Sequence, residues 1–209
     1  MKVCLYIEGG GPYARSQTAT ACRKAFHLFF EKALGDKQKP RIIASGSRDE
    51  AYHDFSRALE ETGTFAVLLV DSEDPVVSGG TAAAHLRHRE HHWTKPMPDD
   101  QVHLMVQCME AWFLADKAAL AKYYGKKFKA SALPTNPKIE EIPKREVLSG
   151  LAGATKETQK GPYHKTKHGF DLLECIDPAA VRKASGHADA LIELILARLR
   201  GNDDDQNPR

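Results

Sequence analysis

Short apolar runs and helix-spaced apolar positions alternate through the first 125 residues of the chain. The apolar runs, rich in β-forming residues, are KVCLYIE at 2–8, RIIAS at 41–45, FAVLLVD at 65–71 and VHLMVQ at 102–107. Between and after them, helical patterns cover about 14–34, 48–62, 81–92 and 109–124. Alternation of this kind predicts βαβ units with right-handed crossovers. The fold class is therefore α/β, with a Rossmann-like central parallel sheet of about four strands between helices.

The second part of the chain predicts a helical cover rather than a second sheet. Pro134, Pro137 and Pro143 interrupt a loop-rich stretch, after which helical patterns return at 144–154, 165–175 and 178–198. We expect a single domain over 1–200, with a sheet core at about 1–125 and a helical C-terminal part at about 126–200. The polar segment GNDDDQNPR at 201–209 predicts a disordered tail.

Composition narrows the class of protein. The 209 residues are 42% hydrophobic and 28% charged, and the net charge of +2 is too small to attract nucleic acid without a local basic patch. The four cysteines form no CxxC pair, which disfavours a zinc site or disulfide framework and favours the cytoplasm. Since no signal peptide is evident and no apolar run approaches the roughly 20 residues of a membrane span, we expect no membrane association.

Carboxylates follow two of the predicted strands. Glu8 ends the first strand, Asp71 ends the third, and Glu73 and Asp74 come directly after it. Ligands of parallel sheets bind beyond the carboxyl ends of the strands, so these side chains converge if the first and third strands are neighbours. Clustered carboxylates suit Mg²⁺ or Mn²⁺, and the glycines at 9–11 would let a phosphate approach the backbone. Each acid taken alone is equally typical of a helix cap or turn.

The segments YIEGGG at 6–11 and LLVDSED at 68–74 together resemble the TOPRIM signature. That signature has a glutamate after the first strand and an Asp-x-Asp pair after the third. TOPRIM domains occur in topoisomerases, primases, and OLD-family and other defence nucleases. The resemblance implies that Glu8, Asp71 and Glu73 hold the metal. Because the second acid of the pair is Glu73 rather than Asp, Asp74 is an alternative ligand.

A narrower resemblance covers most of the chain. VQCMEAWFLAD at 106–116 and YHKTKHGFDLLECIDP at 163–178 are similar to an uncharacterised TOPRIM-like family, domain of unknown function 4276. The likeness implies an anti-phage or nuclease role beside a partner ATPase. It also makes Glu110 a candidate metal ligand or general base, although an acid at a helix start is favoured by the helix dipole alone.

Basic residues supply the remaining candidates. The densest positive patch runs from Lys156 to His168, with Lys165 and Lys167 as the preferred phosphate contacts, although such a patch is also typical of a solvated surface. The histidines in HLRHREHHW (His85, His88 and His92) have a spacing that can bind zinc, but a mobile polar helix near the active face is the favoured interpretation.

These residues predict a Mg²⁺- or Mn²⁺-dependent nuclease that cleaves DNA or RNA, with Glu8, Asp71, Glu73, Glu110, Lys165 and Lys167 in its site. Two alternatives stay open. The first is a non-catalytic module that binds a nucleotide or phosphate or docks onto an ATPase, and the second is a nucleotidyl or phosphoryl transferase. The apolar segment ALIELILARL at 190–199 would pack either on the sheet or on a second copy in a homo-oligomer.

Overall fold

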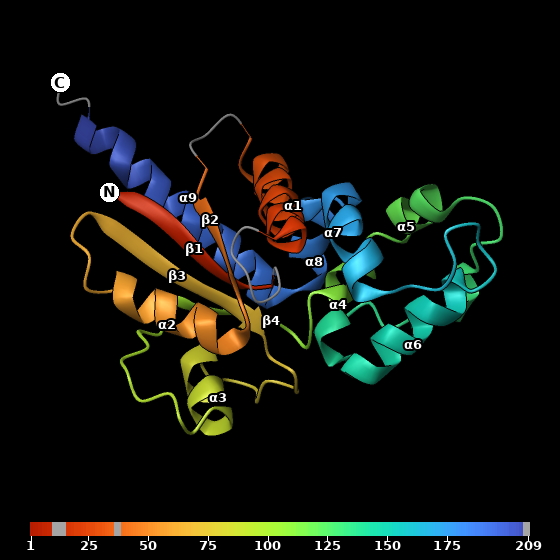
Figure 1. Cartoon of the computed structure of the whole chain (residues 1–209), viewed down its shortest axis with the longest axis horizontal. Coiled ribbons are helices and arrows are strands. Elements are labelled where there is room, and N and C mark those ends of the chain that lie inside the picture. The colour runs from red at the N-terminus through yellow and green to blue at the C-terminus, as the bar shows by residue number, and fades with distance from the viewer. Residues whose placement is uncertain (10–15, 36–38, 207–209) are drawn as a thin grey trace.

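Four parallel strands form the centre of the molecule (Figure 1). The computed structural model describes residues 1–9, 16–35 and 39–206, with side chains as far as residue 200. The strands are β1 (Lys2–Glu8), β2 (Arg41–Gly46), β3 (Thr64–Asp71) and β4 (Val102–Met105). Their order is β2-β1-β3-β4, and every neighbouring pair is parallel. The predicted α/β class is confirmed, and β1 and β3 are neighbours, as convergence of their acids requires.

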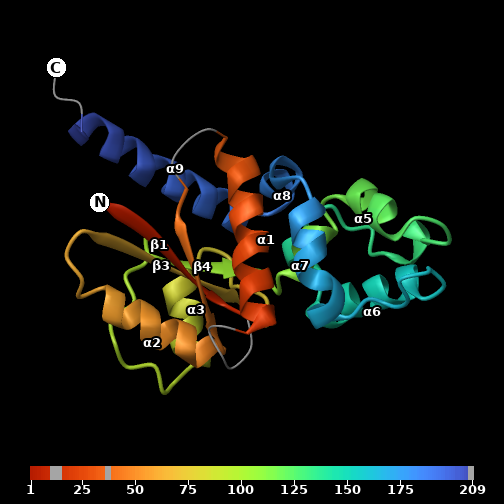
Figure 2. The same ribbon diagram turned by 45° about the horizontal axis from the view of Figure 1, so that its top comes forward.

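Helices cover both faces of the sheet (Figures 1 and 2). One face carries α2 (Arg48–Ala58) and α3 (Ala82–Arg89), and the other carries α1 (Gln17–Leu34). The chain continues through α4 (Glu110–Phe113), α5 (Lys117–Tyr124), α6 (Lys144–Thr155), α7 (Lys165–Cys175), α8 (Pro178–Ala184) and α9 (Gly186–Gln206). Short 3₁₀ turns lie at Ala130–Ala132 and Ile139–Glu141.

The apolar side chains form one cluster on each face of the sheet. Alternate residues of β3 point to opposite sides, so Val67 and Leu69 join α1 and the C-terminal helices, whereas Leu68 and Val70 join α2 and α3. This explains the uninterrupted apolar run of β3, because a central parallel strand is buried on both faces. The C-terminal helices share the α1 cluster and therefore complete the core on that side.

Two expected elements differ from the structure. The helix predicted over 109–124 is two helices, because the Asp116 side chain accepts the Ala119 N–H (2.9 Å) and starts α5 anew. Helix α9 ends at Gln206 and so covers part of the segment 201–209, for which the sequence predicted a disordered tail. Residues 207–209 of that tail lie outside the described part.

Within the described ranges, none of the helices combines the length and the apolar character that a membrane crossing would need.

Candidate functional site

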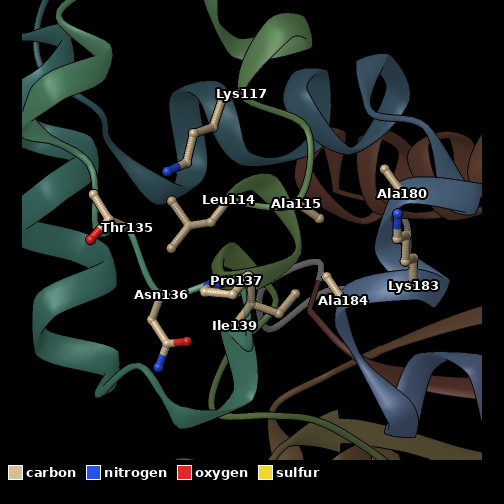
Figure 3. A pocket seen from close by; sticks show the side chains of 10 residues that line it. All are labelled: Leu114, Ala115, Lys117, Thr135, Asn136, Pro137, Ile139, Ala180, Lys183 and Ala184. Carbon is tan, nitrogen blue, oxygen red and sulfur yellow. The ribbon is translucent and has the colours of Figure 1, made fainter.

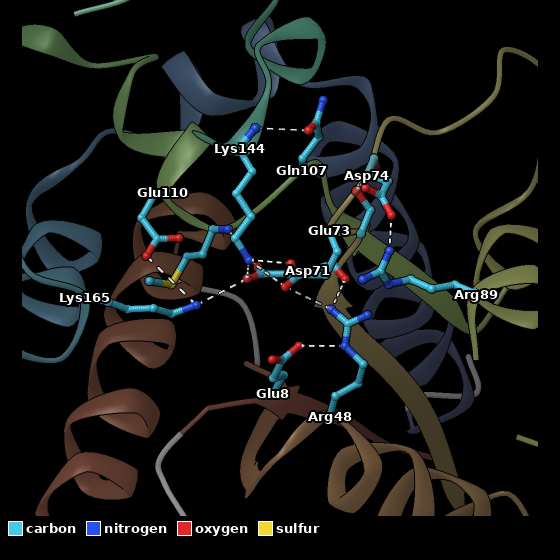
Figure 4. Close-up of polar contacts among 12 residues, drawn as sticks. Glu8, Arg48, Asp71, Glu73, Asp74, Arg89, Gln107, Glu110, Lys144 and Lys165 are labelled. Atoms are coloured by element: carbon cyan, nitrogen blue, oxygen red, sulfur yellow. Dashed lines mark hydrogen bonds and ion pairs between the residues drawn. The ribbon is translucent and has the colours of Figure 1, made fainter. Parts of the chain in front are cut away.

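Four carboxylates and three cations meet beyond the carboxyl end of the sheet (Figure 4). The acids are Glu8 at the end of β1, Asp71 at the end of β3, Glu73 just after it, and Glu110 at the start of α4. The cations are Arg48, Lys144 and Lys165, which begin α2, α6 and α7. We call these seven residues the charged cluster. It joins five residues singled out from the sequence with two that were not.

Asp71 lies at the bottom of the charged cluster. Its side chain is only 3% exposed, with Oδ1 accepting the Met109 N–H at 2.8 Å and Oδ2 lying 3.3 Å from Lys165 Nζ. Burial raises the pKa of Asp71 to about 6, against the opposing charge of Lys165 and with the help of the nearby Glu110 and Glu8 carboxylates. Asp71 is thus an acid that titrates close to neutral pH.

Glu73 is held from two directions. Its backbone φ of 67° is in the left-handed region, which non-glycine residues seldom occupy, and its N–H donates to the Gln107 carbonyl (2.8 Å). Both carboxylate oxygens accept from Lys144 Nζ, at 2.6 and 2.7 Å. Burial disfavours the charged form, but the bond to Lys144 outweighs it, so the pKa of Glu73 lies below its usual range.

Arg48 connects the ends of β1 and β3. Its guanidinium donates to Glu8 Oε2 at 3.3 Å and Glu73 Oε1 at 3.4 Å, and to the Asp71 carbonyl at 2.6 Å. It also donates to Glu90 at 3.0 Å, which leaves the Arg48 side chain only 13% exposed. The planar fork of an arginine suits such a hub because its five N–H groups point in fixed directions.

Glu110 is fully buried beside Lys165. Its Oε1 accepts the Tyr163 hydroxyl at 3.0 Å and lies 4.0 Å from Lys165 Nζ. Its Oε2 has no hydrogen-bond partner among the described residues. Since buried polar atoms are almost always partnered, this oxygen marks a place where a ligand or water would be stabilised.

The charged cluster has the donor chemistry of a divalent-metal site. Its carboxylates are the hard oxygen ligands that Mg²⁺ and Mn²⁺ prefer, and Glu110 Oε2 makes no hydrogen bond to the described residues that would compete with a metal. As the side chains stand, however, no three Asp, Glu, His or Cys groups of the described chain are close enough to share one ion. Lys144 and Lys165 lie between the acids instead.

Several predicted site residues lie outside the charged cluster. Asp74 is 62% exposed and pairs with Arg89, while Lys167 Nζ donates to the Lys160 carbonyl at 3.3 Å. The histidines separate: His85 lies against the Ser72 carbonyl (2.9 Å), and His92 pairs with Asp49 (2.8 Å) beyond the end of α3. The glycines at 10 and 11, expected to approach a phosphate, lie outside the described residues.

Sequence reasoning missed Arg48, Lys144 and Tyr163. Arg48 could have been found, because it follows the end of β2 by two residues and the rule applied to the first and third strands holds for the second as well. Lys144 has no comparable signal, and Tyr163, although it begins the segment 163–178 quoted above for its family likeness, has none that indicates a role for its hydroxyl. They come from the loop-rich second half of the chain and meet their partners across 71 and 53 residues.

A separate cavity of about 580 Å³ lies between the segment 114–117 that follows α4, the segment 135–139 and α8 (Figure 3). Its walls are mostly apolar, including Leu114, Pro137 and Ile139, with the ammonium groups of Lys117 and Lys183 at its edge. It contains no carboxylate lining residue and therefore offers different chemistry from the charged cluster.

Comparison with known proteins gives one match. The family described as "Domain of unknown function (DUF4276)" matches residues 15–196, which include six of the seven members of the charged cluster. Searches of curated proteins and of solved structures find no match to the chain.

Proposed function

This chain belongs to the DUF4276 family, and on that footing we propose that it is a divalent-metal-dependent phosphodiester hydrolase related to TOPRIM nucleases, with DNA or RNA as its substrate. The observation that carries the proposal is the charged cluster itself. Carboxylates, which are suitable metal ligands, and cations, which are suitable phosphate contacts, alternate at the carboxyl end of the sheet, where parallel α/β proteins bind ligands.

Glu8, Asp71 and Glu73 are the residues that would hold the Mg²⁺ or Mn²⁺ ion. Glu8 and Asp71 are positioned by adjacent strands, and Glu73 follows Asp71 by two residues. A bound ion of this kind supplies Lewis-acid chemistry, in that it lowers the pKa of a coordinated water and neutralises charge that develops on the phosphate.

The cations of the charged cluster have separate tasks in this proposal. Lys165 is 54% exposed, so its ammonium can leave Asp71 and donate to a non-bridging phosphate oxygen. Arg48 is largely covered and fixes the carboxylates of Glu8 and Glu73 relative to each other. The Tyr163 hydroxyl donates to Glu110 and orients it. Burial alone would lower the pKa of Lys165, but the carboxylates of Asp71 and Glu110 outweigh it and raise that pKa.

A second candidate function rests on the ion pairs that the cluster already contains. Because Glu8, Asp71 and Glu73 each contact a cation, the cluster is also suited to exchange these partners for a phosphate group without cleaving a bond. In that case the chain is a phosphate-binding module, and metal-dependent turnover is the property that separates the two.

The test measures cleavage of labelled single- and double-stranded DNA and RNA in Mg²⁺, Mn²⁺ and chelator. We expect metal-dependent products from wild type and losses of about 10²-fold or more in Glu8→Gln and Asp71→Asn, in line with removal of a group that stabilises the transition state. Asp74→Asn is the matched control, since this nearby acid lies outside the charged cluster, and it should stay within about threefold of wild type.

Two results would reject hydrolysis at this site. One is wild-type activity in the Glu8→Gln and Asp71→Asn proteins. The other is a wild-type protein that binds oligonucleotides but gives no product with either metal, which selects the phosphate-binding module.

A further inference from the structure

Two lysine-rich loops, far apart in the sequence, form one groove beyond the charged cluster. The loop after α5 carries Lys126 and Lys127, and the loop after α6 carries Lys156 and Lys160. Both loops lie at the same end of the molecule (Figures 1 and 2). The Lys129 N–H donates to the Ala154 carbonyl at 2.9 Å and its ammonium pairs with Glu157 at 2.5 Å, which ties the loops together.

The groove between these loops has a volume of about 720 Å³ and a positive rim. Lys126, Lys127 and Lys160 line it, against the single acid Glu157, which is already paired with Lys129. Among the residues that the structure describes, none forms an ion pair with Lys126, Lys127, Lys156 or Lys160. These exposed charges are therefore available to a partner.

Two tyrosines line the same groove. Lys160 Nζ lies 4.4 Å from the centre of the Tyr123 ring, and this cation–π contact holds the ammonium at the groove. Tyr124 also lines the groove, and its buried hydroxyl has no hydrogen-bond partner in the described part of the chain. A groove lined by lysines is the arrangement that tracks the backbone of a nucleic-acid strand.

The first turn of α7 joins the groove to the charged cluster. Lys165 points to Asp71, and two residues later Lys167 contacts the backbone of Lys160. The rings of Tyr123, His168 and Tyr163 continue the connection, with centroids 6.4 and 6.2 Å apart, and the Tyr163 hydroxyl ends on Glu110. A nucleic-acid strand bound in the groove would thus lie next to α7, the helix that supplies Lys165.

We propose that this groove, lined by Lys126, Lys127 and Lys160, binds the phosphate backbone of a nucleic-acid strand whose cleavage site lies in the charged cluster. The location of the cleavage site in this proposal rests on the proposed function, whereas binding in the groove does not. The lysines come from two loops, Lys126 and Lys127 from one and Lys160 from the other, which suits contacts with more than one phosphate of a chain.

The test measures the affinity for a labelled single-stranded oligonucleotide in chelator, over a series of salt concentrations. The groove variant is Lys126→Gln/Lys127→Gln/Lys160→Gln. The matched control, Lys2→Gln/Lys95→Gln/Lys183→Gln, removes the same number of charges from exposed lysines elsewhere. Far-UV circular dichroism and thermal unfolding check that both proteins fold, and Lys126→Gln/Lys127→Gln is a milder second variant that leaves the Lys160–Tyr123 contact intact.

We expect the groove variant to bind at least tenfold more weakly than wild type at low salt, with the control within about threefold. Each lost phosphate contact lowers the slope of log affinity against log salt by about 0.7 for single strands, so the groove variant should lose about 2 from this slope. Equal slopes in the groove and control variants would overturn the proposal, as would wild-type affinity no greater for an oligonucleotide than for a dinucleotide.

This outcome is independent of catalysis. The binding assay is run in chelator, where the proposed metal-dependent cleavage does not proceed. If the groove variant binds more weakly than wild type but neither metal gives cleavage, the proposed hydrolase is rejected and the groove is kept as the binding site. Metal-dependent cleavage of long strands that is unchanged in the groove variant would keep the hydrolase and reject the groove.

Discussion

At the scale of single residues, the charged cluster contains charges that would be unfavourable to bury alone and that stabilise one another through ion pairs. Asp71 and Glu110 are buried carboxylates, which would be strongly unfavourable alone, and Lys165 lies within 3.3 Å of the first and 4.0 Å of the second. Removing one member leaves an opposite charge uncompensated. The residues of the cluster are therefore expected to respond together to substitution, metal and pH.

The raised pKa of Asp71 predicts a pH dependence of stability in chelator. The unfolded chain releases this proton near pH 4, whereas the folded chain retains it until about pH 6, so the free energy of unfolding falls as pH rises through that window. Between about pH 4 and pH 7 it should fall by about 2 kcal/mol more in wild type than in Asp71→Asn. Urea unfolding at each pH measures the difference, and parallel pH profiles for the two proteins would contradict it.

In the proposed function, Lys144 would compete with the metal ion for the carboxylate of Glu73. Its ammonium bonds both oxygens of Glu73 and lies 3.9 Å from Asp71 Oδ2. Lys144→Met should therefore lower the Kd for Mn²⁺ by about tenfold, as one charge-assisted contact no longer has to be broken. Calorimetric titration measures this without a turnover assay.

Arg145→Met is the matched control for Lys144→Met, because Arg145 is the next residue of α6, carries the same charge and is exposed. Its affinity for Mn²⁺ should match wild type within about threefold. Weaker Mn²⁺ binding by Lys144→Met, or equal changes in both variants, would show that Lys144 is not a competitor.

At the scale of elements, the charged cluster is built from the ends of strands and helices. Arg48, Lys144 and Lys165 are each the first residue of a helix, a position where the helix dipole disfavours a cation. Stabilisation of the helices therefore does not explain the positive charges at these three positions. The acids at the ends of β1 and β3 explain them, because they attract all three cations to the same point.

The strands were more predictable than the helices beyond them. Four apolar runs each became a strand, and their parallel pairing follows from the helices between them. The prediction of one continuous helix over 109–124 was wrong. The apolar periodicity continues through Asp116, but the Asp116 side chain caps a new helix at that point. Periodicity detects the buried face of a segment and not a break in its backbone.

At the scale of the whole molecule, two apolar clusters on opposite faces share the same four strands. Trp112 lies in one, stacked on Phe29 with ring centroids 5.2 Å apart, and Trp93 lies in the other, stacked on Tyr52 at 4.2 Å. Because every strand contributes to both clusters, loss of either would expose the other.

This sharing predicts cooperative unfolding of the entire chain. In Trp93→Phe the remaining fluorescence reports on the helical cover, and in Trp112→Phe it reports on the α2–α3 face. Within each variant, the urea midpoint by fluorescence should coincide with the midpoint by far-UV circular dichroism. Separate midpoints would show instead that the C-terminal helices unfold as an independent unit.

The sequence by itself determined the α/β class, the parallel sheet and the presence of acids at its carboxyl edge, because these depend on local periodicity and on the order of elements along the chain. Only the tertiary structure decided which charges face those acids. Lys144 reaches Glu73 across 71 residues, Lys165 reaches Asp71 across 94, and Lys126 meets Lys160 at one groove. Such meetings follow from how the loop-rich second half packs against the sheet, and no local pattern encodes that packing.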